Sequence, residues 1–215
     1  MTFTLMKIKF QDFRQKMKDD FLTKTANSQK TTVKKKVSFK QKPETAKNAN
    51  LCNEVIVCGD SLLNNIDGKG LSSKQARVRV KNFPGADTED MIDFVKPLLK
   101  KSPKFLIVHA GTNDITSGCQ TKENLETIRN LVTETSPSTE LIFSEVLLRE
   151  DRINSQSLVK EKNKIIGNFC ERYNLHFIEH NNISRKMLAS KKLHLNGGGI
   201  STFAQNLKKF VCGNC

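Results

Sequence analysis

From about residue 53 onward, short apolar runs typical of β-strands alternate with stretches that have helical periodicity. Residues 105–109 (FLIVH) are apolar up to the final histidine, which suits a central parallel strand buried on both faces. Four further runs complete a predicted set of five strands, at residues 54–58, 76–83, 141–148 and 175–178. This alternation predicts an α/β domain in which a mainly parallel sheet lies between two layers of helices.

Helical stripes of apolar residues lie between these runs. The helix over 91–98 follows acidic residues at 87–90, and carboxylates interact favourably with the positive end of a helix dipole. Thr121 is the expected N-cap of the next helix, which carries an apolar stripe from Leu125 to Val132. A third stripe runs from Leu158 to Phe169, and the clearest stripe covers residues 200–211.

The first fifty residues differ in composition from the rest. They carry 13 Lys and Arg against 4 Asp and Glu, a net charge of +9, whereas the other 165 residues carry 23 against 18, a net charge of +5. We therefore predict a basic arm over 1–50 and a folded domain over 51–215. The arm has helix-compatible spacing of Phe and Met over 10–21 and is otherwise expected to be disordered. It is either a solvated linker or a tether that binds the phosphates of RNA or single-stranded DNA through Lys34, Lys35 and Lys36.

Cysteine usage and hydropathy narrow the class of protein. Cys212 and Cys215 form a single CxxC pair, and a zinc site needs about four ligands, so we expect neither a metal nor a cofactor. Cys58 and Cys170 lie in apolar patterns that suit buried, reduced thiols. No run reaches the roughly 18 apolar residues of a membrane span. The N-terminus lacks the apolar segment of a signal peptide, and an intracellular protein is expected.

Polar motifs follow three of the predicted strands, and a fourth motif precedes the last helix. In an open α/β sheet, the loops at the carboxyl ends of the strands form the ligand site. The motifs are Gly59-Asp60-Ser61, Pro84-Gly85-Ala86, Gly111-Thr112-Asn113-Asp114 and Leu193-His194-Leu195-Asn196.

These residue types are the components of a serine hydrolase. Ser61 supplies a hydroxyl nucleophile and a backbone N–H at the start of a helix. Gly85 lets its backbone N–H approach a ligand with no side chain in the way, and the Asn113 amide is a third donor. Together the three donors are suited to an oxyanion hole. His194 is the candidate general base for the Ser61 proton.

In this order, the motifs resemble those of the SGNH or GDSL hydrolase superfamily over roughly residues 53–211. The resemblance implies a flavodoxin-like fold and the hydrolysis of short-chain acyl esters or lipid-like esters. It implies that Ser61 and His194 are catalytic, with Ser61, Gly85 and Asn113 as oxyanion donors. The remaining motif residues, Gly59, Asp60, Gly111 and Asp114, support the site. More narrowly, the motifs resemble the esterase-type domain of first open-reading-frame proteins of animal non-LTR retrotransposons, which also fits a basic arm.

One position departs from the superfamily pattern. An aspartate normally lies three residues before the histidine and orients it, but here the position is Lys191. A backbone carbonyl could orient His194 instead, or Glu179, after the last predicted strand, could replace the aspartate. The sequence thus predicts a weak esterase. The alternative is a catalytically silent scaffold that acts as a nucleic-acid-binding or assembly module of a retroelement.

Overall fold

The computed structural model describes residues 15–16, 19–20, 23, 52–117 and 120–215, and the chain divides into two units, Met1–Leu51 and Cys52–Cys215. The described residues of the first unit are helical, and Gln15 Nε2 donates a hydrogen bond to Asp19 Oδ1 at 3.0 Å, one turn away. The described strands all belong to the second unit. The residues behind the predictions for the arm lie outside the described residues: Phe10, Phe13, Met17, Phe21, Lys34, Lys35 and Lys36.

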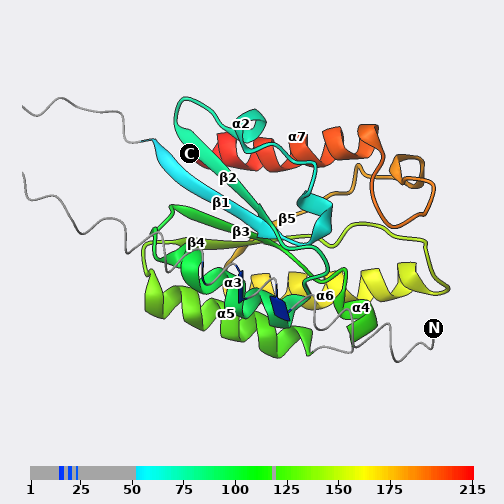
Figure 1. Cartoon of the computed structure of the whole chain (residues 1–215), viewed down its shortest axis with the longest axis horizontal. Helices are drawn as coiled ribbons and strands as arrows, with labels where there is room; N and C mark the ends of the chain where they lie inside the picture. The colour runs from blue at the N-terminus through cyan, green and yellow to red at the C-terminus, as the bar shows by residue number, and fades with distance from the viewer. Residues whose placement is uncertain (1–14, 17–18, 21–22, 24–51, 118–119) are drawn as a thin grey trace, which may run out of the picture. The chain divides into compact units, whose positions relative to one another are not determined.

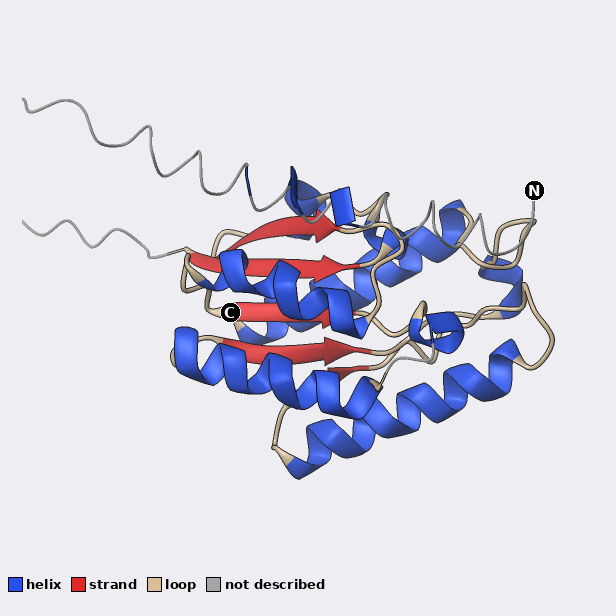
Figure 2. Cartoon of the chain, turned by 60° about the horizontal axis from the view of Figure 1, so that its bottom comes forward, coloured by secondary structure: helices blue, strands red, loops and turns tan. Residues whose placement is uncertain are grey.

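Five parallel strands form one sheet in the order β2-β1-β3-β4-β5 (Figures 1 and 2). This is the strand order of flavodoxin-like folds, whose ligand site lies where the chain changes direction between β1 and β3. The predicted fold class is therefore confirmed. The strands are β1 (Asn53–Gly59), β2 (Ala76–Asn82), β3 (Phe105–His109), β4 (Glu140–Ser144) and β5 (His176–Ile178).

Helices cover both faces of the sheet. Figure 1 shows α2 and α7 on one face and α3, α5 and α6 on the other, which gives three layers. No helix among the described residues combines the length and the apolar composition that crossing a membrane requires. The helices are α2 (Gly68–Leu71), α3 (Thr88–Leu99), α4 (Asp114–Ser117), α5 (Thr121–Thr135), α6 (Ser155–Arg172) and α7 (Gly197–Asn214), with short 3-10 turns η1 (Ser61–Leu63) and η2 (Arg185–Met187).

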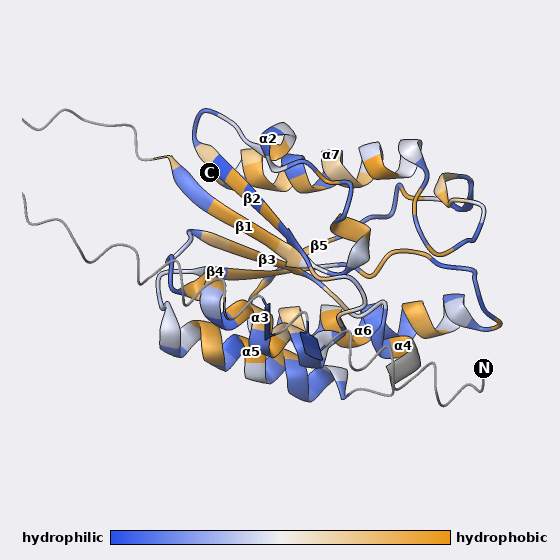
Figure 3. Cartoon of the chain, in the orientation of Figure 1, coloured by the Kyte–Doolittle hydropathy of each residue, from blue (hydrophilic) through white to orange (hydrophobic). Residues whose placement is uncertain are grey.

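The core lies between the sheet and the inward faces of the helices, where apolar residues gather (Figure 3). All five residues of β3 are buried, as the apolar run predicts. The predicted stripe of α7 is confirmed, because Phe203, Leu207 and Val211 are fully buried. Leu158, at the start of the stripe predicted for α6, is instead 36% exposed.

The fourth strand is shorter than predicted. The sequence predicts a strand over 141–148, but β4 ends at Ser144. Beyond it, the side chain of Asn163 on α6 binds both backbone groups of Val146: its Oδ1 accepts from the N–H at 2.8 Å and its Nδ2 donates to the carbonyl at 2.9 Å. A side-chain amide thus replaces strand pairing, and the chain is free to leave the sheet toward the candidate site.

Candidate active site

Ser61 and His194 come together at the carboxyl ends of the strands. Ser61 Oγ lies 3.2 Å from His194 Nε2, although 133 residues separate them in the sequence. Both residues line a hollow of about 450 Å³. The other residues that line it are Leu62, Asn64, Asn65, Pro84, Leu195 and Ile200.

Close packing between two strand ends positions the serine. A Cβ atom at Gly59 would lie 2.1 Å from the carbonyl oxygen of His109, so only glycine fits at the end of β1. The next residue, Asp60, donates its backbone N–H to the same oxygen at 3.3 Å. Its side chain caps η1, because Oδ1 accepts from the Leu62 N–H at 2.9 Å. Ser61 therefore opens a single 3-10 turn rather than the longer helix that the sequence predicts.

Asp60 is completely buried beneath this turn, and its charge is affected by several neighbours. Burial raises the pKa of Asp60 to about 6, while the Leu62 N–H, the Thr112 hydroxyl and the Arg149 guanidinium oppose that rise. The carboxylate of Asp114 raises it further. The buried side chain thus lies close to the loop that carries Asn113, but its Oδ2 has no hydrogen-bond partner among the described residues.

Two unpaired backbone N–H groups belong to the predicted oxyanion donors. Gly85 has a φ of +81°, in the left-handed region that favours glycine. Within residues 52–117 and 120–215, the N–H groups of Ser61 and Gly85 donate to no protein acceptor. Buried or half-buried N–H groups usually have partners, so these two are available to a ligand.

Asn113 joins the second and third loops of the site. Its Nδ2 donates to the carbonyl oxygen of Ala86 at 2.8 Å, which fixes the amide beside the Gly85 turn. The turn that presents it needs Gly111, whose φ is +122° and whose added Cβ would lie 2.7 Å from Val146 Cγ2. The structure therefore brings all three predicted donors into loops at the same end of the sheet.

Asp114 is buried, and it joins neighbouring elements instead of lining the hollow. It accepts from the Thr88 N–H at 2.9 Å, from the Thr88 hydroxyl at 2.7 Å and from the Thr121 hydroxyl at 2.6 Å. The predicted role of Thr121 as a helix cap is wrong. Gln120 occupies the N-cap position of α5, and the Thr121 hydroxyl is bound to Asp114 instead.

Backbone hydrogen bonds hold the segment that carries His194. The His194 carbonyl accepts from the Ala189 N–H at 2.8 Å, and Leu188 and Leu195 form an antiparallel bridge. Asn196 then caps α7 by accepting from the Gly199 N–H at 3.0 Å. Among the described residues, no acceptor is within hydrogen-bonding distance of Nδ1 of His194, and Lys191 is exposed.

Glu179 does not replace the missing aspartate. Its carboxylate accepts from Asn181 Nδ2 at 3.0 Å. It lines a separate hollow with Phe210 and Asn214, near the far end of α7 from His194. The hypothesis that Glu179 orients the imidazole is therefore not supported by the structure.

Sequence reasoning missed Arg149, a 4% exposed arginine in the loop after β4. Its Nη1 donates to the carbonyl of Thr112 at 2.7 Å. Its Nε and Nη2 donate to the two carboxylate oxygens of Asp151, at 2.7 Å each. Arg149 therefore anchors the residue that precedes Asn113. Nothing in the local sequence distinguishes it from the neighbouring surface charges.

The chain matches no family model and no curated protein sequence. Solved structures nevertheless share its fold. A Streptococcus pneumonia protein, provisionally named a platelet activating factor, is 17% identical and has a TM-score of 0.74, with 98% of this chain and 100% of that chain covered. A GDSL-like lipase from Bacteroides thetaiotaomicron is 12% identical, with a TM-score of 0.66 and coverage of 92% and 98%.

An acetylxylan esterase from Geobacillus stearothermophilus is also similar. It is 16% identical, has a TM-score of 0.58, and the match covers 74% of this chain and 94% of that chain. Two structures of that esterase are catalytic mutants in which an aspartate or a serine is replaced by alanine. At these identities the likeness concerns the fold.

Proposed function

We propose that this chain is a carboxylic-ester hydrolase of the SGNH/GDSL type, with Ser61 as nucleophile and His194 as general base. The observation that carries the proposal is the 3.2 Å approach of Ser61 Oγ to His194 Nε2. It is supported by the N–H groups of Ser61 and Gly85, which have no protein acceptor among the described residues, and by a shared fold with a GDSL-like lipase and an acetylxylan esterase. The hollow suits a small acyl group, because Leu62, Leu195 and Ile200 line it.

In the proposed reaction, Ser61 Oγ attacks the ester carbonyl while His194 Nε2 takes the hydroxyl proton. The carbonyl oxygen becomes an oxyanion that accepts from the N–H groups of Ser61 and Gly85 and from the Asn113 amide. When the tetrahedral intermediate collapses, His194 returns the proton to the departing alcohol. A water molecule then attacks the acyl-enzyme carbonyl while His194 Nε2 takes its proton, and that proton passes to Ser61 Oγ as the carboxylic acid leaves.

Turnover is expected to be slow, because no carboxylate in the described part of the chain orients the imidazole. In the serine-protease triad, replacing the aspartate by an amide lowers turnover about ten-thousand-fold. Here, backbone hydrogen bonds and a short antiparallel bridge hold the 189–196 segment that carries His194. A Ser–His pair of this kind is expected to act on activated esters first, since their alcohols need little protonation to leave.

A fluorophosphonate probe tests the proposal directly. Full-length protein is incubated with the probe, and the labelled peptide is identified by mass spectrometry. We expect a single adduct on Ser61, because its hydroxyl contacts the His194 imidazole and the residue lines the hollow, whereas Ser144, which also contacts imidazoles, is buried. Absence of labelling at Ser61 would instead favour a catalytically silent scaffold.

Lys191→Asp is expected to raise turnover of nitrophenyl acetate by a modest factor, about three- to ten-fold rather than the full ten-thousand-fold of a triad. An aspartate would accept from Nδ1–H and so leave Nε2 free to face Ser61. The gain is limited because the loop was not shaped around an aspartate, and Lys192, with a φ of +57°, fixes its turn. Lys191→Asn is the matched control, since it removes the cation without supplying a carboxylate. An unchanged rate in Lys191→Asp would mean that the backbone already holds the ring.

A second proposed function is the binding of nucleic acid by the arm. The observation that favours it is the uneven charge, with a net +9 on residues 1–50. Clustered lysines neutralise phosphates without reading base sequence. We propose this role alongside the esterase, because the two functions reside in different units of the chain.

Full-length protein is expected to bind single-stranded RNA with little sequence preference, and the affinity should fall steeply with added salt. A chain that starts near Asn50 should lose most of this binding and keep its esterase activity. Fluorescence anisotropy at several salt concentrations measures both effects. Equal binding by the truncated chain would place the nucleic-acid site on the folded domain instead.

A further inference from the structure

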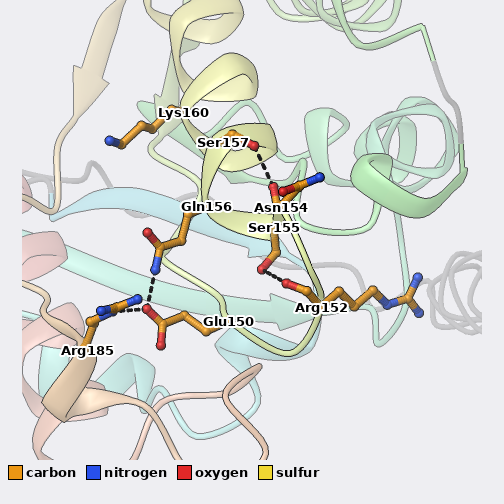
Figure 4. A pocket seen from close by; sticks show the side chains of 8 residues that line it. All are labelled: Glu150, Arg152, Asn154, Ser155, Gln156, Ser157, Lys160 and Arg185. Atoms are coloured by element: carbon orange, nitrogen blue, oxygen red, sulfur yellow. Dashed lines mark hydrogen bonds and ion pairs between the residues drawn. The ribbon is translucent and has the colours of Figure 1, made fainter.

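Glu150, in the loop between β4 and α6, contacts three separate segments of the chain. Its backbone N–H donates to the carbonyl oxygen of Lys192 at 2.8 Å, two residues before His194. Its carboxylate accepts from Arg185 Nε in η2 and from Gln156 Nε2 in the first turn of α6 (Figure 4). Glu150 thus binds the segment that carries His194 at two points and links that segment to α6. We call the contacts of Glu150 with Lys192, Arg185 and Gln156 the brace.

The ion pair between Glu150 and Arg185 is less exposed to solvent than an ordinary surface ion pair. The Glu150 side chain is only 16% exposed, so its carboxylate lies in a partly desolvated position where an ion pair is less screened. The Arg185 side chain, in contrast, is 68% exposed. Removing the arginine charge is therefore expected to loosen the loop without opening the core.

Arg149, the preceding residue, makes a similar contact with the loop that carries Asn113. It donates to the Thr112 carbonyl at 2.7 Å, immediately before Asn113. Consecutive residues of one loop thus hold the segment of the general base and the segment of an oxyanion donor. Relative movement of these segments would change the distance between His194 and the reacting carbonyl.

We propose that Glu150 and Arg185 are positioning residues that hold His194 against Ser61 in place of the missing aspartate. The inference rests on the proposed function for its kinetic consequence, but the structural role stands by itself. Neither residue touches the imidazole. They act through the backbone of the 185–194 segment, whose displacement by about 1 Å is enough to cost roughly a hundred-fold in rate.

The kinetic test compares Arg185→Gln and Glu150→Gln with Arg152→Gln in the full chain. Arg152 is the matched control: it lies in the same loop, but its guanidinium extends away from Glu150 and lies 3.7 Å from Asp151 (Figure 4). We expect kcat on nitrophenyl acetate to fall about ten-fold in the first two variants with KM nearly unchanged, because binding groups stay in place. Arg185→Lys should retain an intermediate kcat.

A second measurement does not depend on turnover. Amide hydrogen exchange over residues 185–196 should become at least several-fold faster in Arg185→Gln and in Glu150→Gln, and stay at the wild-type rate in Arg152→Gln. The two proposals can fail separately. If exchange is faster in the two variants but the wild type shows no Ser61-dependent hydrolysis, the proposed esterase is refuted while the structural role of the brace stands. Wild-type exchange rates in both brace variants, or an equal effect in Arg152→Gln, would overturn the inference.

Discussion

Ser61→Ala is expected to remove nearly all of the enzymatic hydrolysis of nitrophenyl acetate. The substitution removes the attacking oxygen, while Gly85, Asn113 and His194 stay in place. In an efficient serine hydrolase, loss of the nucleophile lowers kcat on the order of a million-fold, and the remainder comes from the oxyanion hole and binding. Because no carboxylate among the described residues orients His194, we expect a lower wild-type rate and a smaller fall, about a hundred- to a ten-thousand-fold.

Ser138→Ala is the matched control for this result. Ser138 is an exposed serine in the turn between α5 and β4, at the opposite end of the strands from Ser61. Its replacement should leave the rate unchanged. Equal rates for wild type and Ser61→Ala, after correction for spontaneous hydrolysis, would assign any observed activity to general surface catalysis and favour the silent scaffold.

Much of the fold could be predicted because strand and helix patterns are local. The buried run of β3 and the stripe of α7 each have one dominant periodicity, and burial follows it. The end of β4 could not be predicted in the same way. Residues 146–148 are as apolar as a strand, but a side chain from α6, Asn163, takes the backbone hydrogen bonds of Val146. That competition comes from a contact across the fold and leaves no local signal.

The candidate site shows the same division. Ser61, Gly85, Asn113 and His194 could be predicted, because each follows a strand or precedes a helix at the edge where loops converge. The supporting residues could not, since Arg149 and Glu150 act through carbonyl groups of distant loops. The hypothesis for Glu179 failed because position after a strand says nothing about which hollow the side chain faces.

Acidification below about pH 6.5 is expected to destabilise the folded domain. A buried chain of hydrogen bonds links Asn206, His180, Ser144 and His109, with atom separations of 3.0, 2.8 and 3.0 Å. Because the Asn206 Nδ2 donates, His180 Nδ1 accepts, and the proton of His180 lies on Nε2 toward Ser144. The Ser144 hydroxyl then donates to His109. Each ring must be neutral for this network to form.

Burial of both imidazoles sets the direction of the pH effect. It lowers the pKa of His109 to about 3 and that of His180 to about 4, from 6.5 for an exposed histidine. Below pH 6.5 the two histidines bind protons in the unfolded chain but stay neutral in the folded chain. The free energy of unfolding is therefore highest above pH 6.5 and falls as the pH drops toward 4 and 3. At pH 5 each of these two histidines lowers the free energy of unfolding of the domain by about 2 kcal/mol. Asp60 acts in the opposite direction, because its raised pKa of about 6 favours the folded state on acidification by about 1 kcal/mol.

Urea unfolding near pH 7.5 and near pH 5 measures the balance, which we expect to be a net loss of about 2 to 3 kcal/mol at the lower pH. His180→Gln cannot titrate, so its unfolding free energy should change by about 2 kcal/mol less between the two pH values, whatever its stability at neutral pH. His176→Gln is the control, because His176 is an exposed histidine outside the network. An unfolding free energy that stays constant or rises on acidification would show that the two buried rings take up protons in the folded state. In that case the neutral Asn206–His180–Ser144–His109 network would not describe the core beneath the site.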